Sequence, residues 1–173
     1  MEHSKSLLKI HNNFPKQGIS FVDVFPIFQD PVAAEAIINK FVYHIYSTYN
    51  EKVDVVIGVA ARGLLFGPSV ALRLRAAFVP VSKLGTLPAD CIRVVYTKQY
   101  GKDTLEIQKH AIKPGWRAIV IDDMLATGGT AAAAGKLAEL CAATVVRYMF
   151  VMEKPFLKGA SKLNAPVHSL FQF

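Results

Sequence analysis

The sequence predicts an α/β protein with a mostly parallel central sheet flanked by helices. Short runs of β-branched and aliphatic residues alternate with longer helical stretches, and short turn-rich segments join them. This alternation is typical of strand–helix–strand units, whose strands lie parallel in one sheet. With 173 residues, 52% of them hydrophobic and 19% charged, the chain can bury a sizeable core. We therefore expect a single domain over residues 1–173.

The N-terminal part combines an irregular segment with a helix. Residues 14–28 (FPKQGISFVDVFPIF) are rich in aromatic residues and contain two prolines and a glycine, which predicts a cap without regular structure. A helix is then expected over residues 31–49, with Asp30 as its N-cap and Pro31 in its first turn.

The remaining chain alternates strands with helices. We expect core strands at residues 53–59, 76–83, 116–122 and 144–152, a further strand at 168–173, and helices at 64–75 and 130–141. Two more strand-like runs, 92–97 and 104–109, flank a glycine at position 101 and predict a β-hairpin turning there.

Charged residues follow three of the predicted core strands. Arg62 comes after the first strand, Lys83 ends the second, and Asp122–Asp123 end the third. Open parallel sheets bind ligands at the carboxyl ends of their strands. The sequence therefore predicts a binding site built from these side chains.

The segment after the paired acids has the features of an anion-binding loop. Gly128 and Gly129 permit backbone conformations that turn successive N–H groups toward an anion, and the following helix adds its free N–H groups and positive dipole end. Thr127 and Thr130 add hydroxyl donors. A GK[ST] sequence does not follow the glycines, so the loop is not of the Walker type. Residues 126–130, starting at Ala126, are thus predicted to hold a monophosphate.

The paired acids favour hydroxyl groups rather than phosphate. A carboxylate accepts two hydrogen bonds in a fork, which matches the vicinal diol of a ribose. A divalent cation on that ribose would relieve the repulsion between Asp122 and Asp123. Acids and loop together predict a ribose 5-phosphate ligand. The alternative, two exposed acids before an ordinary capped helix, leaves the order of the whole string unexplained.

The net charge indicates which classes of ligand to expect, and the cysteine spacing indicates which cysteine chemistry to expect. A net charge of +7, from 20 Lys+Arg against 13 Asp+Glu, favours anionic ligands, but the basic residues are scattered and form no run typical of nucleic-acid binding. Cys91 and Cys141 have no CxxC spacing and are expected to be reduced thiols. Because no apolar run approaches the roughly 20 residues of a membrane span and no signal peptide is visible, we expect a cytoplasmic protein without a membrane partner.

Four blocks of the sequence resemble a known enzyme family. IVIDDMLATGGT (119–130) resembles the phosphoribosyl pyrophosphate (PRPP) signature of the type I phosphoribosyltransferases. FPKQGISFVDV (14–24), ARGLLFGPSVA (61–71) and YGKDTLEIQKHAIKPG (100–115), in this order, resemble more closely the adenine phosphoribosyltransferases, with similarity from Phe14 to Phe173.

This resemblance implies a fold and an activity. The type I phosphoribosyltransferase fold has a mostly parallel sheet, an N-terminal hood, here residues 1–30, and a flexible catalytic hairpin loop, here 91–109. The activity is transfer of the 5-phosphoribosyl group from PRPP to adenine, with Mg²⁺, giving AMP and pyrophosphate in purine salvage. The family resemblance also implies a homodimer.

The resemblance also implies roles for single residues. Asp122 and Asp123 would hold the ribose hydroxyls and, through them, a ribose-bound Mg²⁺, while residues 126–130 would bind the 5′-phosphate. Arg62 and Lys83 would face the pyrophosphate.

Other residues would contact the base or act in the hairpin loop. Phe21 would stack on adenine, backbone groups near Ile19 and Val22 would read its edge, and Gln99 and Tyr100 would lie in the catalytic loop. The family usually has a glutamate at the position of Gln99, where it handles a proton on the purine N7, and glutamine cannot exchange that proton.

Further departures leave two alternatives open. Ala60, Ser82 and Thr86 differ from the family pattern around the pyrophosphate, and Val22 and Lys154 differ where the base is chosen. The alternatives are a phosphoribosyltransferase for hypoxanthine, guanine or xanthine, and a catalytically weakened sensor of PRPP or nucleotides.

Overall fold

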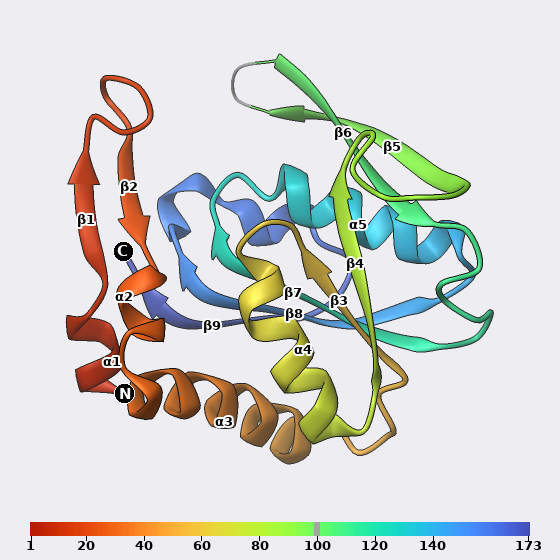
Figure 1. Cartoon of the computed structure of the whole chain (residues 1–173), viewed down its shortest axis with the longest axis horizontal. Coiled ribbons are helices and arrows are strands. Elements are labelled where there is room, and N and C mark those ends of the chain that lie inside the picture. The colour runs from red at the N-terminus through yellow and green to blue at the C-terminus, as the bar shows by residue number, and fades with distance from the viewer. Residues whose placement is uncertain (99–100) are drawn as a thin grey trace. The chain divides into compact units, whose positions relative to one another are not determined.

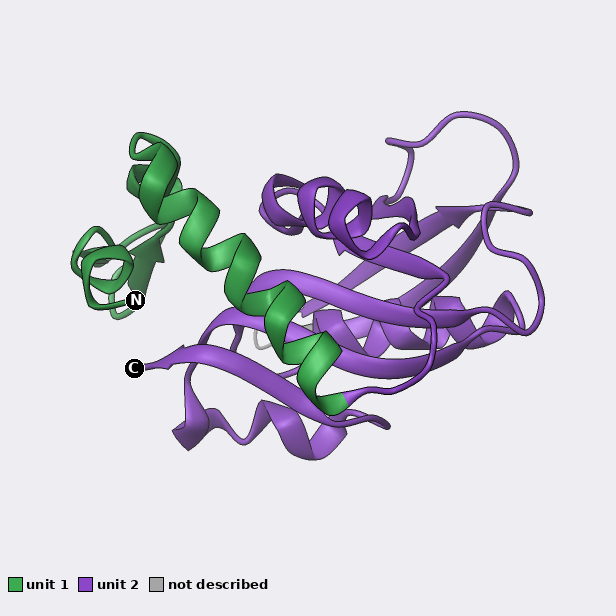
Figure 2. Ribbon diagram, turned by 90° about the horizontal axis from the view of Figure 1, so that it is seen from below, with its two compact units in different colours: residues 1–48 green, residues 49–173 purple. Residues whose placement is uncertain are grey.

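The computed structural model of the chain describes residues 1–98 and 101–173 (Figure 1). The chain forms two compact units, Met1–Thr48 and Tyr49–Phe173 (Figure 2). The first unit extends past residue 30 and includes a long helix, and the role of residues 1–30 as a hood stays a prediction. Within the described residues, no helix is both long and apolar enough to span a membrane.

The first unit contains more regular structure than the sequence predicted. Its elements are α1 (Glu2–Ser6), β1 (Lys9–Asn12), β2 (Ser20–Asp23), α2 (Phe25–Phe28) and α3 (Pro31–Thr48). The prediction of an irregular cap over 14–28 was wrong, because β2 and α2 lie within it and β2 pairs antiparallel with β1. The short strand β1 is fully exposed and so lacks the apolar alternation by which strands are recognised.

The long helix α3 begins where it was predicted. The Asp30 carboxylate accepts hydrogen bonds from the N–H groups of Val32, at 2.9 Å, and Ala33, at 3.1 Å. These two N–H groups have no partner inside the helix, so the side chain acts as the expected N-cap.

The second unit is built around a seven-stranded sheet of order β5-β6-β4-β3-β7-β8-β9. Five strands are parallel, as predicted, and the β5–β6 hairpin runs antiparallel beside β4. The elements are β3 (Val55–Val59), α4 (Gly63–Leu74), β4 (Ala77–Lys83), β5 (Cys91–Lys98), β6 (Gly101–Gln108), β7 (Arg117–Leu125), α5 (Gly129–Leu140), β8 (Thr144–Glu153), β9 (Val167–Gln172) and the short 3₁₀ helices η1 (Pro155–Leu157) and η2 (Gly159–Lys162).

The two helices α4 and α5 pack against opposite faces of this sheet. Ile57 of β3 belongs to a buried cluster that includes Leu137 of α5. Gly58, the next residue, points to the other face, because side chains alternate along a strand. There the ring of Phe78 fills the space left by Gly58 and by Gly67 of α4. Both faces of the central strands are therefore covered, which explains their continuous apolar runs.

Two predicted boundaries differ from the structure. The predicted β-hairpin is confirmed, and its ladder continues to the pair Lys98–Gly101, so Gly101 is the first residue of β6. Strand β7 runs on to Leu125, which pairs with Glu153 of β8, so Asp122 and Asp123 lie inside the strand and not at its end. In both cases pairing with a neighbouring strand extends the element beyond its apolar residues.

An acid–arginine network joins the starts of β3 and β7. The Asp54 carboxylate accepts hydrogen bonds from the Arg117 backbone N–H, at 2.9 Å, and from Arg117 Nε, at 3.3 Å. Arg117 also forms an ion pair with Glu51. The backbone N–H of Arg117, followed by its guanidinium, holds the pKa of Asp54 below its usual value, although burial opposes this. The network thus stabilises the end of the sheet where β3 and β7 begin.

Replacing Asp54 with asparagine should lower the midpoint of thermal unfolding by about 3–6 °C, since a hydrogen bond to a charged group is worth roughly 1.5 kcal/mol or more. The pKa of Asp54 is lower in the folded chain than in the unfolded one. Its stabilisation is therefore complete above the unfolded value of about 3.9 and is lost as pH falls through the folded pKa.

Circular dichroism melts of the wild type and the Asp54→Asn variant, from about pH 7 down to pH 3, test this linkage. The difference between the two proteins should shrink toward the acid end. A difference that stays constant over this range would contradict the assignment.

Candidate active site

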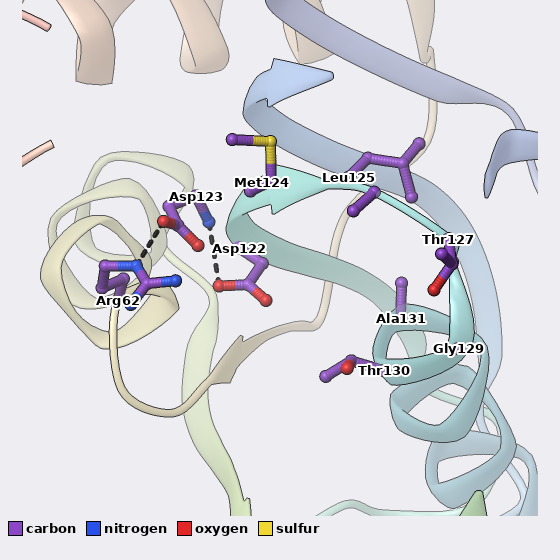
Figure 3. Close-up of a pocket in the computed structure, with 11 residues that line it drawn as sticks. Arg62, Asp122, Asp123, Met124, Leu125, Thr127, Gly129, Thr130 and Ala131 are labelled. Carbon is purple, nitrogen blue, oxygen red and sulfur yellow. Dashed lines mark hydrogen bonds and ion pairs between the residues drawn. The ribbon is translucent and has the colours of Figure 1, made fainter. Parts of the chain in front are cut away.

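Two adjoining pockets lie at the carboxyl ends of β3, β4 and β7. One is lined by Arg62 and residues 122–131 (Figure 3). The other is lined by Ala60, Ala61, Arg62, Lys83, Tyr96, Leu105, Asp122, Asp123 and Thr130. Both pockets share Arg62, the two acids and Thr130. The structure therefore brings together the side chains that the sequence placed at three separate strand ends.

The two acids differ in their surroundings. Asp123 is buried, with a side chain 4% exposed, and forms an ion pair with Nε of Arg62 (Figure 3). The Asp122 carboxylate accepts a hydrogen bond from the N–H of Asp123 at 2.9 Å. Burial, and then the negative charge of Asp123, raise the pKa of Asp122 well above its usual value, while that N–H and Arg62 act in the opposite direction. Cations or hydroxyl donors from a ligand would stabilise such a pair.

Close packing of α4 on β7 fixes the position of Arg62. The residue follows a cis Ala60–Ala61 peptide bond and is the N-cap of α4. A Cβ atom at the next position, Gly63, would lie 2.5 Å from the carbonyl oxygen of Ile121. Only glycine permits this approach, and it places Arg62 directly beside the acids of β7.

A contact between two glycines shapes the loop that is predicted to bind an anion. Gly128 has a φ of +78° and is the N-cap of α5. A Cβ atom on Gly128 would collide with the carbonyl oxygen of Gly159, and one on Gly159 would collide with the carbonyl oxygen of Ala126. The backbones of the loop and of η2 therefore touch each other. The sequence pointed to Gly128 but not to Gly159, which stands in no recognisable motif.

The hairpin packs against the same loop. The hydroxyl groups of Thr130 and Tyr96 lie 3.5 Å apart, and a Cβ atom on Gly129 would lie 2.9 Å from the carbonyl oxygen of Thr97. Tyr96 lines the second pocket, yet nothing in the sequence singles it out, because it stands among ordinary strand residues. Its position shows that β5 forms one wall of the site.

The residues expected to contact the base belong to the first unit. Phe21 packs edge-on against Phe14 with ring centroids 5.2 Å apart, and Val22 is buried in β2. The Ile19 N–H donates to the carbonyl oxygen of Lys16 at 3.2 Å, and the Ile19 carbonyl accepts from the N–H of Phe14 at 3.1 Å. Their role in binding adenine stays a prediction.

The two predicted loop residues, Gln99 and Tyr100, lie outside the described residues, so their catalytic role also stays a prediction.

The acids of β7 fit a metal ion that arrives with a ligand. Among residues 1–98 and 101–173, no group of three or more His, Cys, Asp or Glu side chains could hold a metal by itself. Asp122 and Asp123 offer two carboxylates, and Mg²⁺ commonly binds through one or two carboxylates together with oxygens of a phosphorylated substrate.

Comparison with known proteins identifies the family. Residues 28–165 match the phosphoribosyl transferase domain. Adenine phosphoribosyltransferase 1 of Saccharomyces cerevisiae is 49% identical over 96% of this chain and 89% of its own length. The adenine phosphoribosyltransferase of Solibacter usitatus is 43% identical over 100% of this chain and 99% of its own length.

Solved structures agree with this result. The crystal structure of the Saccharomyces cerevisiae adenine phosphoribosyltransferase, in complex with an imino-altritol bisphosphate and adenine, has a TM-score of 0.94 at 48% identity, covering 98% of this chain and 97% of that one. The Trypanosoma brucei enzyme, in complex with AMP, pyrophosphate and ribose-5-phosphate, has a TM-score of 0.90 at 26% identity, covering 99% and 78%. The chain therefore belongs to the adenine phosphoribosyltransferase family, within the type I phosphoribosyltransferases.

Proposed function

We propose that this chain transfers the 5-phosphoribosyl group of PRPP to adenine, giving AMP and pyrophosphate. The observation that carries the proposal is the convergence of the Asp122–Asp123 pair, the loop 126–130 and the cations Arg62 and Lys83 around two adjoining pockets. Relatives that are 42–49% identical are named for this activity. The reaction would serve purine salvage in the cytoplasm.

Each part of PRPP has a suitable partner in this arrangement. The 5′-phosphate would bind residues 126–130, where the start of α5 and the backbone of Gly128 supply N–H donors. The ribose hydroxyls would donate to Asp122 and Asp123. The pyrophosphate would bind Lys83 and Arg62, whose planar guanidinium can meet phosphate oxygens two at a time.

The reaction displaces pyrophosphate from the anomeric carbon, through a transition state with positive charge on the sugar. Asp122 and Asp123 would stabilise the sugar, and Arg62 and Lys83 the departing pyrophosphate, so that each half of the separated charge has fixed partners. Mg²⁺, when bound with PRPP, would supply further neutralisation of the phosphate oxygens, and Asp122 and Asp123 would hold it through the ribose hydroxyls.

The base and the loop complete the proposed site. Phe21 would stack on adenine, and the backbone near Ile19 and Val22 would bind its edge, with a homodimer as the working assembly. Gln99 and Tyr100 would close over the reacting centre and exclude water. Gln99 would hydrogen-bond the purine but could not take its proton, so the proton would leave through water.

Incubation of the protein with PRPP and Mg²⁺ and each of adenine, hypoxanthine, guanine and xanthine tests the substrate. We expect AMP from adenine and no nucleotide from the other bases, measured by chromatography. Faster turnover of another purine would replace adenine as the substrate. PRPP binding without product from any base would support a sensor instead.

Replacing Gln99 with glutamate should raise kcat, since a general acid–base residue typically contributes about 10²–10⁴-fold. Glutamate can exchange a proton with the purine, and glutamine cannot. The Gln99→Met variant, which has a similar size but no hydrogen-bonding group, is the control and should be slower than the wild type. An unchanged or lower kcat for Gln99→Glu would show that this position does not handle the proton.

A further inference from the structure

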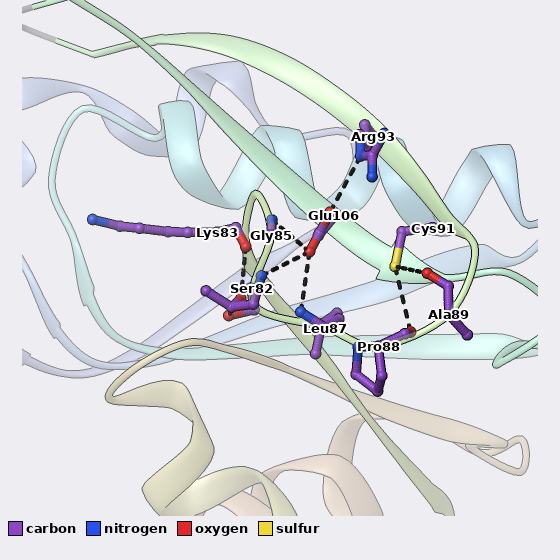
Figure 4. A network of polar contacts seen from close by, with 10 residues as sticks. Ser82, Lys83, Gly85, Leu87, Pro88, Ala89, Cys91, Arg93 and Glu106 are labelled. Carbon is purple, nitrogen blue, oxygen red and sulfur yellow. Dashed lines mark hydrogen bonds and ion pairs between the residues drawn. The ribbon is translucent and has the colours of Figure 1, made fainter.

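Glu106 of β6 is a buried carboxylate held by four hydrogen-bond donors. Its side chain is 1% exposed. Oε1 accepts hydrogen bonds from the backbone N–H groups of Gly85, at 2.9 Å, and of Thr86 and Leu87, both at 3.1 Å. Oε2 accepts a hydrogen bond from Nε of Arg93 at 3.2 Å (Figure 4).

This arrangement keeps Glu106 charged and binds the loop to it. A buried carboxylate is costly unless it is hydrogen-bonded, and three successive N–H groups form a concave site for an anion. The N–H of Leu87 contributes most to holding the pKa of Glu106 below its usual value, with Arg93 and the other two N–H groups adding to it and burial opposing. At neutral pH the carboxylate therefore acts as an internal anion around which residues 85–87 fold.

The loop held by Glu106 directly follows Lys83. Strand β4 pairs with β6 at Ser82–Glu106 and Lys83–Leu105, and Lys83 and Leu105 both line the second pocket. The Thr86 hydroxyl lies 2.6 Å from both the Ser82 hydroxyl and the Lys83 carbonyl oxygen. The backbone of Lys83 is thus fixed on one side by the β6 ladder and on the other by a turn anchored to Glu106.

Figure 4 shows the Lys83 side chain extending away from this network. Its ammonium group therefore depends on Glu106 only through the backbone. A long, flexible lysine loses rotamer entropy when it binds a ligand. A backbone that is already fixed adds no further loss of conformational entropy, so the total entropic cost of binding is smaller.

We propose that Glu106 is a positioning residue for the pyrophosphate half of the site, which it serves by fixing Lys83 through residues 85–87. The inference rests on the proposed function, because it takes Lys83 to be a pyrophosphate ligand. Arg93 extends the same network to β5, so the hairpin and Lys83 share one anchor.

A comparison of PRPP with AMP separates this role from a general contribution to folding. AMP has the ribose, the 5′-phosphate and the base but lacks the pyrophosphate. The Glu106→Gln variant should therefore bind PRPP with Mg²⁺ about tenfold more weakly, while its affinity for AMP changes by less than about twofold. Titration calorimetry measures both. An equal loss for the two ligands would overturn the proposal.

A double-mutant cycle tests whether Glu106 acts through Lys83. If it does, Lys83→Met combined with Glu106→Gln should bind PRPP no more weakly than Lys83→Met alone. Independent, additive losses would contradict this route.

Two further variants control for a general loss of stability and for failure of the Glu106→Gln variant to fold. Asp54→Asn removes a comparable carboxylate just before β3, which accepts hydrogen bonds from a backbone N–H and from an arginine side chain. This variant should be less stable, but its ratio of PRPP affinity to AMP affinity should not change. If Glu106→Gln does not fold, Arg93→Met tests the same network from a side chain that is 57% exposed. It should weaken PRPP binding about two- to threefold and leave AMP binding unchanged, and no change in PRPP affinity would overturn the inference.

The binding measurements do not depend on turnover. If the wild type binds PRPP but makes no AMP from adenine, the proposed function fails. The affinity ratios of the variants still decide whether Glu106 positions Lys83.

Discussion

The backbone contact between Gly128 and Gly159 is the constraint on which the proposed phosphate site depends. Gly128 must adopt a positive φ while its Cα lies against the carbonyl oxygen of Gly159, and Gly159 in turn lies against the carbonyl oxygen of Ala126. Neither position has room for a side chain, so the backbone of η2 packs directly against the backbone of the loop. It holds the loop in one conformation at the start of α5, where N–H groups are available for an anion.

At the same edge of the sheet, two acidic side chains lie next to each other and close to one arginine. Two adjacent acids in the C-terminal half of β7 are partly compensated by Arg62, and the pKa of Asp122 is raised by burial and by Asp123. A ligand could bring hydroxyl groups and a cation to these acids, and phosphate groups to Arg62 and Lys83. Such a ligand would reduce the repulsion between the acids and pair the two cations with negative charge. Glu106 has a comparable role in the proposal, because its carboxylate is an anion of the protein itself and the backbone N–H groups of residues 85–87 fold around it.

The sequence predicted the parts of the site that depend on local chemistry. Short contiguous stretches of sequence contain the paired acids, the glycine loop and the alternating strands and helices. The second pocket is lined by Arg62 and Lys83, which the sequence also pointed to. Gly159, Tyr96 and the anchoring role of Glu106 were missed, because each acquires its meaning from a residue distant in the chain. Strand β1 was missed because it is short and exposed, and β7 was predicted too short because pairing with β8 extends it.

Titration of ribose 5-phosphate into the wild type and a Gly159→Ala variant tests whether the contact between Gly128 and Gly159 maintains the proposed phosphate site. Gly115→Ala is the control, because Gly115 has a positive φ, of 81°, and nothing within 4 Å of an added Cβ atom, so this variant carries a backbone cost without a steric collision. The wild type and the control should bind with similar affinity, and a folded Gly159→Ala variant should bind about tenfold more weakly or worse, since the loop must shift to admit the methyl group. Unchanged affinity in a folded Gly159→Ala variant would show that phosphate binding does not depend on this backbone contact.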